Sequence, residues 1–410
     1  MATLALKYWL AGRQIRHVAN ARGEVPQAFS ERISLSAHQR AADYTIARVR
    51  LGMTELALGS AMVLGFTLLG GLQWLHQHLI QGLPDSPMIR QLLLLTLVAV
   101  ISSLVDLPLA WYRQFRLEQR FGFNRMTLGL WLADLIKGVL LSALLGLPLA
   151  AAVLWLMNST GANWWLWTWL LWIGFNLFVL VVYPTVIAPW FNKFEPLPEG
   201  DLRERVKALL ARSGFQASGL FVMDGSRRSA HGNAYFTGLG RSKRIVFFDT
   251  LIQRLEPSEI EAVLAHELGH FKRRHVLKRI ISSFSISLAG LWLLGVLAQQ
   301  PWFYQGLGVT ADRDHQALAL LLFFLALPSF TFALQPLMSL VSRSHEFEAD
   351  AFAAAQTDAG HLVSALVKLY QDNAATLTPD PLHSAFYDSH PPAAQRVARL
   401  EQIAAQSATT

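Results

Sequence analysis

The sequence predicts an α-helical polytopic membrane protein with seven transmembrane helices and a small α/β domain on the cytoplasmic side. Three observations lead to this fold class: the composition, the length of the apolar blocks and the placement of the basic residues. Of the 410 residues, 53% are hydrophobic and only 15% are charged, whereas soluble domains carry roughly 25% charged residues. A soluble chain of this length would form two or three domains, and this chain lacks the charge to cover their surfaces.

Six apolar blocks are long enough to cross a bilayer, which takes about 20 residues because a helix rises roughly 1.5 Å per residue. They run over 56–75, 91–111, 138–157, 164–188, 280–298 and 317–340. A seventh block, Leu4–Ala11, is short, and we expect it to be an incomplete first span. The predicted parts of the chain are membrane helices one to five in 1–188, a polar domain in 189–279, helices six and seven in 280–340, and a C-terminal part in 341–410.

The basic residues fall in alternate loops. Arginines are frequent before residue 56 and between 113 and 125, and basic residues continue in 190–279 and at Arg343. The intervening loops contain only Arg90, no basic residue in 158–163, and Arg313. The positive-inside rule therefore places 190–279 and 341–410 in the cytoplasm and requires the first block to span. We interpret the net charge of +7 as a topology signal, so the predicted partner is the lipid bilayer and not a nucleic acid.

The polar segment between the fifth and sixth spans has the pattern of a small α/β domain. Its apolar spacing predicts a helix over 201–213. Branched and aromatic residues predict strands over 219–223 and 244–248, with a third at the sheet edge over 233–236. A helix is expected over 259–272, with Ser258 as its N-cap.

That last helix contains His266-Glu267-Leu268-Gly269-His270, which matches the H-E-x-x-H zinc motif. Two histidines four residues apart lie on one helix face, so both imidazoles can reach one ion. Glu267 is rotated by about 100° and can take a proton from a water at the metal without ligating it. The chain has no cysteine, which excludes disulfides, iron–sulfur clusters and cysteine-ligated zinc.

A catalytic zinc needs a third protein ligand and an open fourth position. The only other dense cluster of histidine and acidic residues runs from Ser344 to Asp350. On a helix, Glu346 and Asp350 share a face, which favours Glu346 as ligand and leaves Asp350 free to hydrogen-bond a ligand imidazole. His345 is a competing ligand that sequence geometry does not exclude. We expect His275, five residues after His270, to be a surface residue near the bilayer.

These motifs together resemble the type I CAAX prenyl endopeptidases, which are membrane zinc metalloproteases of the gluzincin type. The resemblance extends over nearly the whole chain. Besides the two zinc clusters, it rests on Phe121-Gly122-Phe123-Asn124, Asn233-Ala234-Tyr235-Phe236, Lys243-Arg244-Ile245-Val246, Phe248-Asp249-Thr250-Leu251, and Ser389-His390-Pro391-Pro392 with Arg396. The short first span departs from the family pattern.

The resemblance implies one Zn²⁺ per chain and a role for each matching residue. His266, His270 and Glu346 would bind the zinc, Glu267 would be the general base and then acid, and Asp350 would orient a ligand histidine. His390 and Arg396 would approach the oxyanion or the substrate carbonyls, and Asn233, Ala234 and Tyr235 would pair with the substrate backbone. It also implies seven spans around an intramembrane chamber, capped by the zinc domain.

The function that follows is hydrolysis of peptide bonds near the C-terminus of CAAX-type or other membrane-associated peptides, prenylated or not. One alternative is a membrane zinc protease for protein quality control, although such proteases have fewer spans. Another is a transporter or receptor with a structural zinc, which predicts a fourth protein ligand. The 27 arginines against 8 lysines indicate a bacterial inner-membrane protein; in a eukaryote we would expect the endoplasmic reticulum.

Overall fold

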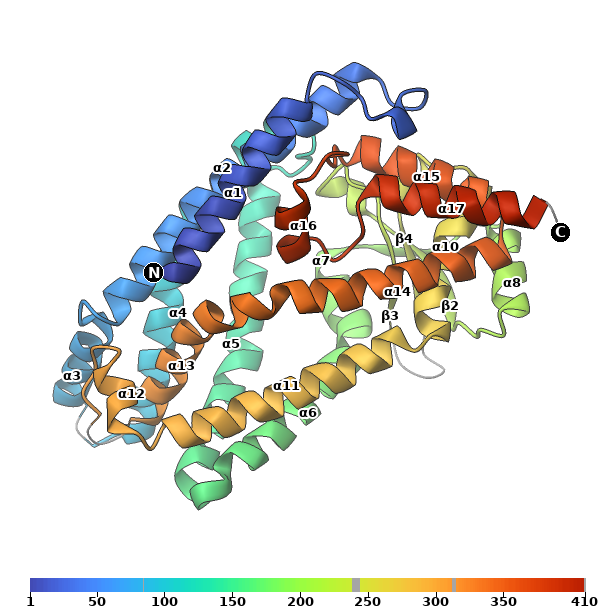
Figure 1. Cartoon of the computed structure of the whole chain (residues 1–410). Coiled ribbons are helices and arrows are strands. Elements are labelled where there is room, and N and C mark those ends of the chain that lie inside the picture. The colour runs from blue at the N-terminus through green and yellow to red at the C-terminus, as the bar shows by residue number, and fades with distance from the viewer. Residues whose placement is uncertain (84, 238–243, 312–314, 409–410) are drawn as a thin grey trace.

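The computed structural model describes residues 1–83, 85–237, 244–311 and 315–408. It consists of a set of long helices and a domain of shorter helices around a small sheet, which lies at one end of the long helices (Figure 1). We call the second part the sheet domain; it comprises the strands β1–β4 and the helices α8–α10 and α15–α17. Lys243, which belongs to one of the motifs that carry the family resemblance, and Arg313, which is the basic residue of a predicted loop, lie outside the described residues.

Six helical stretches of the described chain are long and apolar enough to cross a membrane. They are α2 (Leu35–Phe66); α4 (Pro87–Tyr112) continued to Glu118; α5 (Leu128–Ser159); α6 (Trp164–Val182) continued from Gly161 and through α7 (Ala188–Phe191); α11 (His275–Leu297); and α13 (Gln316–Thr331) continued through α14 (Gln335–Gln356). Shorter helices α3 (Gly71–Gly82) and α12 (Pro301–Gln305) lie between them.

The first two apolar blocks differ from the sequence prediction. Block 56–75 is not one helix, because α2 ends at Phe66 and α3 begins at Gly71, after Gly70 takes a left-handed φ of 81°. The N-terminal helix α1 (Ala2–Ala21) is longer than the predicted block 4–11 and packs along α2 (Figure 1). Its three basic residues Lys7, Arg13 and Arg16 lower its hydropathy, so α1 is not among the six candidate spans.

The longest helical stretch extends well past a bilayer's thickness. At about 1.5 Å per residue, the 41 residues from Gln316 to Gln356 span twice what a hydrocarbon core of roughly 30 Å requires, although breaks at Pro328 and Phe332–Leu334 bend them. The far half, α14, therefore reaches the sheet domain. There it lies against α10 (Pro257–Lys272), which is followed by α11 (Figure 1).

The sheet domain is built on four strands in the order β1-β2-β4-β3. They are β1 (Phe194–Pro196), β2 (Gly219–Met223), β3 (Ala234–Thr237) and β4 (Arg244–Phe248). Strands β2 and β4 are parallel, and β1 and β3 flank them antiparallel. The remaining helices are α8 (Asp201–Arg212), α9 (Asp249–Ile252), α15 (Ala359–Asp372), α16 (Pro381–Tyr387) and α17 (Ala393–Ala408).

Most predicted elements of this domain are confirmed. Strands β2 and β4 have the predicted bounds, and β3 lies at the sheet edge, shifted by one residue. The predicted N-cap Ser258 is wrong: Glu256 caps α10 in a reciprocal capping box with Glu259. The three-residue strand β1 was missed because it is too short to show an alternating pattern.

The motif Phe121–Asn124 joins the long helices to the sheet domain. Gly122 has a φ of 78°, which only glycine adopts without strain. The turn places Phe123 flat against His231, with ring centroids 4.3 Å apart. Asn124 pairs through its backbone with Ser229. This motif therefore fixes the segment that leads into β3.

Candidate metal centre

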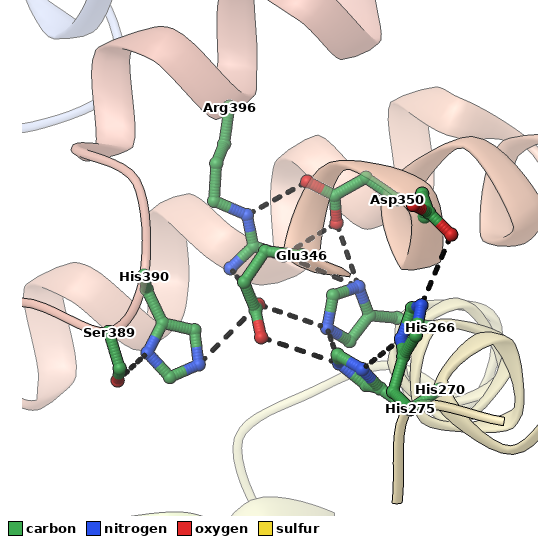
Figure 2. A network of polar contacts seen from close by, with 9 residues as sticks. His266, His270, His275, Glu346, Asp350, Ser389, His390 and Arg396 are labelled. Carbon is green, nitrogen blue, oxygen red and sulfur yellow. Dashed lines mark hydrogen bonds and ion pairs between the residues drawn. The ribbon is translucent and has the colours of Figure 1, made fainter. Parts of the chain in front are cut away.

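The crossing of α10 and α14 brings the two zinc motifs together. The helices are in close contact at Gly269, where a Cβ would lie 2.9 Å from the Cα of Ala349. Real Cβ atoms essentially never come within 3.0 Å of such an atom, so only glycine allows this contact. His266 and His270 on α10 point toward Glu346 on α14 (Figure 2).

Four side-chain atoms from three residues converge between the helices. The Nε2 atoms of His266 and His270 are 3.3 Å apart. Each lies 3.4 Å from a carboxylate oxygen of Glu346, His266 from Oε2 and His270 from Oε1. Among the described residues, these three side chains form a group able to hold a metal ion. His345, the competing ligand, does not belong to it.

The spacing fits a tetrahedral zinc site. Ligand atoms at about 2.0–2.1 Å from a zinc and at tetrahedral angles lie roughly 3.3–3.4 Å from one another. The two Nε2 atoms are 3.3 Å apart, and each lies 3.4 Å from a different oxygen of Glu346. The Oε2 atom of Glu346 is buried and has no hydrogen-bond partner. A buried carboxylate oxygen without a partner is costly, and a cation in the triangle removes that cost. With three protein ligands, a fourth position stays open.

Asp350 and Arg396 fix the first ligand histidine. The Nδ1–H of His266 donates to Oδ1 of Asp350 at 2.8 Å, which directs Nε2 toward the triangle. Arg396 donates to both oxygens of Asp350, at 2.9 and 2.6 Å, so Asp350 cannot rotate. Burial lowers the pKa of His266, but Asp350 and Glu346 outweigh it and raise that pKa to about 9. A metal that binds here must therefore displace a proton.

The structure places Arg396 differently from the role that the resemblance implies. Arg396 is 5% exposed, its guanidinium is engaged with Asp350, and its Nη1 atom lies 3.7 Å from Oε2 of Glu346. His390, by contrast, is 59% exposed in its side chain, with Nε2 3.4 Å from the same oxygen (Figure 2). Glu267 is half-buried and close enough to His390 for their charges to interact. His390 thus lies beside Glu346, and Glu267 lies near His390.

His275 is not the surface residue that the sequence predicts. It is 4% exposed, and its Nδ1 lies 3.0 Å from Nδ1 of His270. The predicted motif helix ended at Lys272 and the next predicted span began at 280, so His275 fell between the two. Arg274, however, takes a left-handed φ of 57° between the two helices. That break turns His275 back onto His270. The one signal in the sequence that could have indicated the break is the basic pair Arg273-Arg274 directly before the new span.

A cavity of about 1450 Å³ connects the triangle with the long helices. His270 and Glu346 belong to its lining, together with many apolar side chains of α5, α6, α11 and α13 and with polar side chains of α11 and α14. Pockets for small ligands usually measure roughly 300–1,000 Å³. The cavity therefore has room for an amphipathic chain that reaches the metal site from membrane depth.

The predicted substrate strand lies at the open edge of the sheet. The N–H of Phe248 donates to the carbonyl of Asn233, and Ala234 is opposite Phe247. In an antiparallel ladder the bonded pairs alternate, so Ala234 and Phe236 direct their backbone groups away from β4 while Tyr235 faces it. The Ala234 N–H is taken by the side chain of Asn233. The edge therefore offers the Ala234 carbonyl and both backbone groups of Phe236.

We expect Gly269→Ala to separate the two halves of the site. The added methyl group forces α14 away from α10, and overpacking of this kind costs typically about 1–3 kcal/mol. Zinc affinity should fall at least about tenfold, measured by competition with a chelator. Gly52→Ala, in a helix where a Cβ meets nothing within 4 Å, should bind zinc like the wild type. Equal affinities for both variants would contradict the close-contact explanation.

Comparison with known proteins matches two family models to consecutive parts of the chain. A model described as "CAAX prenyl protease N-terminal, five membrane helices" matches residues 14–193, and "Peptidase family M48" matches residues 196–404. A rice (Oryza sativa subsp. japonica) protein named CAAX prenyl protease 1 homolog is 37% identical over 318 residues, covering 77% of this chain and 74% of its own. The Saccharomyces cerevisiae CAAX prenyl protease 1 is 36% identical over 334 residues, covering 78% and 73%.

A solved structure shows the same fold. The crystal structure of S. mikatae Ste24p superposes with a TM-score of 0.91 at 31% identity, covering 98% of this chain and 96% of that one. A human relative is 32% identical over 357 residues, covering 78% of this chain and 75% of its own. These relatives come from eukaryotes, so they do not support the bacterial source that the arginine content indicated.

Proposed function

Because the chain belongs to the CAAX prenyl protease 1 family of M48 metallopeptidases, multi-pass membrane proteins that act on peptides, we propose a specific reaction for it. It is a zinc endopeptidase that cuts peptide bonds near the C-terminus of CAAX-type or other membrane-associated substrates, prenylated or not. The observation that carries this proposal is the triangle of His266, His270 and Glu346, of which the last two line a largely apolar cavity.

One zinc per chain would be held by His266, His270 and Glu346. The ion would supply a Lewis acid that polarises the scissile carbonyl and lowers the pKa of a water toward about 7. Glu267, which lies near His390, takes the proton of the attacking water and returns it to the leaving amine. His390, beside Glu346, donates to the oxyanion that develops.

Arg396 acts through Asp350 and not directly on the reacting atoms. Its two hydrogen bonds hold Asp350, and Asp350 holds His266. We therefore assign Arg396 to positioning, with Nη1 adding positive charge near Glu346. The arrangement gives each ligand a fixed direction before a metal arrives.

The substrate is held by adding a strand to β3. Asn233 orients the start of this edge, Ala234 and Phe236 bond to the peptide, and Tyr235 fastens the strand to β4. The bilayer places prenyl or other apolar groups of the substrate against the cavity. We further propose that the site faces the cytoplasm, in agreement with the basic loops, and that nucleic acid is not a partner.

Strand addition predicts an alternating sensitivity to N-methylation of the substrate. A methyl group on a substrate nitrogen that meets the β3 edge removes one hydrogen bond, which is worth about 0.5–1.5 kcal/mol. The value of kcat/KM should fall about 2- to 10-fold there and remain unchanged one residue along. A series of singly N-methylated peptides measures this. A uniform loss at every position would contradict strand pairing.

The topology is testable because the chain has no cysteine of its own. We expect Ala162→Cys and Lys272→Cys to lie on opposite sides of the membrane. In intact bacterial cells that express the chain, an impermeant thiol reagent should label Ala162→Cys, and it should label Lys272→Cys only after lysis. Labelling of both in intact cells would contradict the cytoplasmic position of the site.

The reaction itself is tested with a C-terminally farnesylated peptide, its unprenylated counterpart and an unfolded membrane protein. We expect the wild-type chain with zinc to cut the peptides near their C-termini and to spare the unfolded protein. Preference for the unfolded protein would instead support the quality-control function. Binding of zinc without cleavage of any of the three would support a structural metal.

A further inference from the structure

Arg343 lies on α14, one turn before Glu346, and its side chain holds the C-terminal end of α16. Its Nε donates to the carbonyl of Asp388 at 3.2 Å. Its Nη2 donates to the carbonyl of Ser384 and, at 3.1 Å, to the hydroxyl of the same residue. A basic side chain at a helix C-terminus stabilises the last carbonyls of that helix. The positive-inside rule explains the charge of Arg343, but it does not explain these three contacts.

The segment that Arg343 holds ends at His390. Asp388 is the C-cap of α16, and His390 follows two residues later. The Nε2 atom of His390 lies 3.4 Å from Oε2 of Glu346, and its Nδ1 lies 3.1 Å from the hydroxyl of Ser389 (Figure 2). Because 59% of the His390 side chain is exposed, packing restrains the ring only in part, and the backbone of 388–390 sets its position.

The other end of α16 is held by α1, which lies beside it (Figure 1). Asp380, with 3% of its side chain exposed, caps α16 by accepting from the backbone N–H of His383. Arg13 of α1 donates to both oxygens of Asp380, at 3.3 and 2.9 Å. Gln14 of α1 accepts from the backbone N–H of Asp380 at 2.7 Å. With its start fixed in this way, α16 depends on Arg343 for the direction in which the chain leaves it.

We propose that Arg343 is a positioning residue for His390. It binds the end of α16 from the same helix that carries Glu346, and so it sets the place of the His390 ring relative to that metal ligand. A guanidinium is suited to this task because its planar fork reaches several acceptors at once, whereas an ammonium group is a single point of charge. The assignment rests on the proposed function, in which His390 donates to the oxyanion, and adds a residue to it.

Positioning of an oxyanion donor predicts a loss that is confined to the transition state. Removal of such a donor costs about 10²- to 10³-fold in kcat. Arg343→Gln displaces the donor without removing it, so kcat should fall about 10- to 100-fold, while KM should stay within about threefold of wild type. The variant should still carry one zinc per chain, because Arg343 does not belong to the ligand triangle.

Two further variants control for charge and for folding. Arg343→Lys keeps the charge but not the fork, so its kcat should lie between those of Arg343→Gln and the wild type, with KM unchanged. Arg399→Gln removes an exposed arginine that lies over Phe347 of the same helix α14, 4.6 Å from the ring centroid. It should keep the wild-type kcat.

A double-mutant cycle separates positioning from simple capping of α16. Effects of residues that act through one another do not add. Once His390→Ala has removed the donor, Arg343→Gln should therefore change kcat by no more than about twofold. If Arg343 only stabilised the helix, the two losses would multiply.

Binding of a phosphinic peptide measures the same effect without turnover. Its tetrahedral phosphinate places negative oxygens where the oxyanion develops, as transition-state analogues do. Arg343→Gln should bind this peptide about 10- to 100-fold more weakly, in parallel with kcat. The affinity for the uncleaved substrate peptide, measured with Glu267→Gln as the background, should be the same with and without Arg343→Gln.

Three results would overturn the positioning role: wild-type kcat in Arg343→Gln, multiplied losses in the double variant, or equal weakening of the phosphinic and the substrate peptide. If Arg343→Gln does not fold, Arg343→Lys decides, and a wild-type kcat or a raised KM in that variant counts against the role. Absence of peptide cleavage by the wild-type chain has a different meaning, since it refutes the proposed function and the role of His390 with it.

Discussion

Glu267→Gln is expected to abolish peptide cleavage while leaving the zinc in place. The amide has almost the shape of the carboxylate but cannot accept the proton of the attacking water. Loss of a general base typically costs 10²- to 10⁴-fold in rate, so kcat should fall at least about 100-fold. Because Glu267 is not part of the ligand triangle, the variant should still carry one zinc per chain.

The measurement is single-turnover cleavage of a fluorogenic peptide together with metal analysis of the same sample. Glu401→Gln, an exposed glutamate on α17 that pairs with Arg32, is the matched control and should keep full activity. A Glu267→Gln protein that cleaves within tenfold of wild type would contradict the assignment of the base. Loss of zinc in that variant would contradict the assignment of the ligands.

Replacement of the third ligand should have the largest effect on metal content. Glu346 is 5% exposed and supplies the only carboxylate of the triangle. Glu346→Ala leaves two imidazoles, and its affinity for zinc should drop by more than the 10- to 100-fold that loss of an outer partner costs. Dialysis against a weak chelator should remove the metal, and with it the activity.

Two further variants rank the contributions of the neighbouring carboxylates to zinc affinity. Asp350→Ala removes the partner of His266 and should weaken zinc binding by the smaller, 10- to 100-fold amount. Glu348→Gln, two residues from Glu346 on the same helix, keeps an acceptor for His275 and should retain the zinc. If Asp350→Ala lost zinc more readily than Glu346→Ala, the third ligand would be wrongly assigned.

The metal site was largely predictable because its chemistry is encoded locally. His266, Glu267 and His270 follow from spacing within one helix, and Glu346 with Asp350 follow from a shared face on another. The choice between Glu346 and His345 could not be made from the sequence, because it depends on how α10 and α14 cross. That crossing depends on Gly269 and Ala349, two small residues that carry no chemical signal.

The wrong predictions share a physical cause, the point at which a helix ends. His275 was placed on the surface because the left-handed turn at Arg274 has no glycine to announce it. The apolar block 56–75 was assigned to one span because apolar residues continue through the break at Gly70. Hydropathy indicates whether a segment lies in an apolar environment, but it does not show where a helix is interrupted. It therefore predicts the presence of a span better than the residues at which the span begins and ends.

The central claim is that one zinc lies among His266, His270 and Glu346 with a fourth position open. Anomalous diffraction at the zinc edge, from crystals of the purified chain, measures this most directly. We expect a single peak at about 2.0–2.1 Å from the two Nε2 atoms and from a Glu346 oxygen, with no fourth protein ligand. A peak elsewhere, or a fourth side chain on the metal, would contradict it.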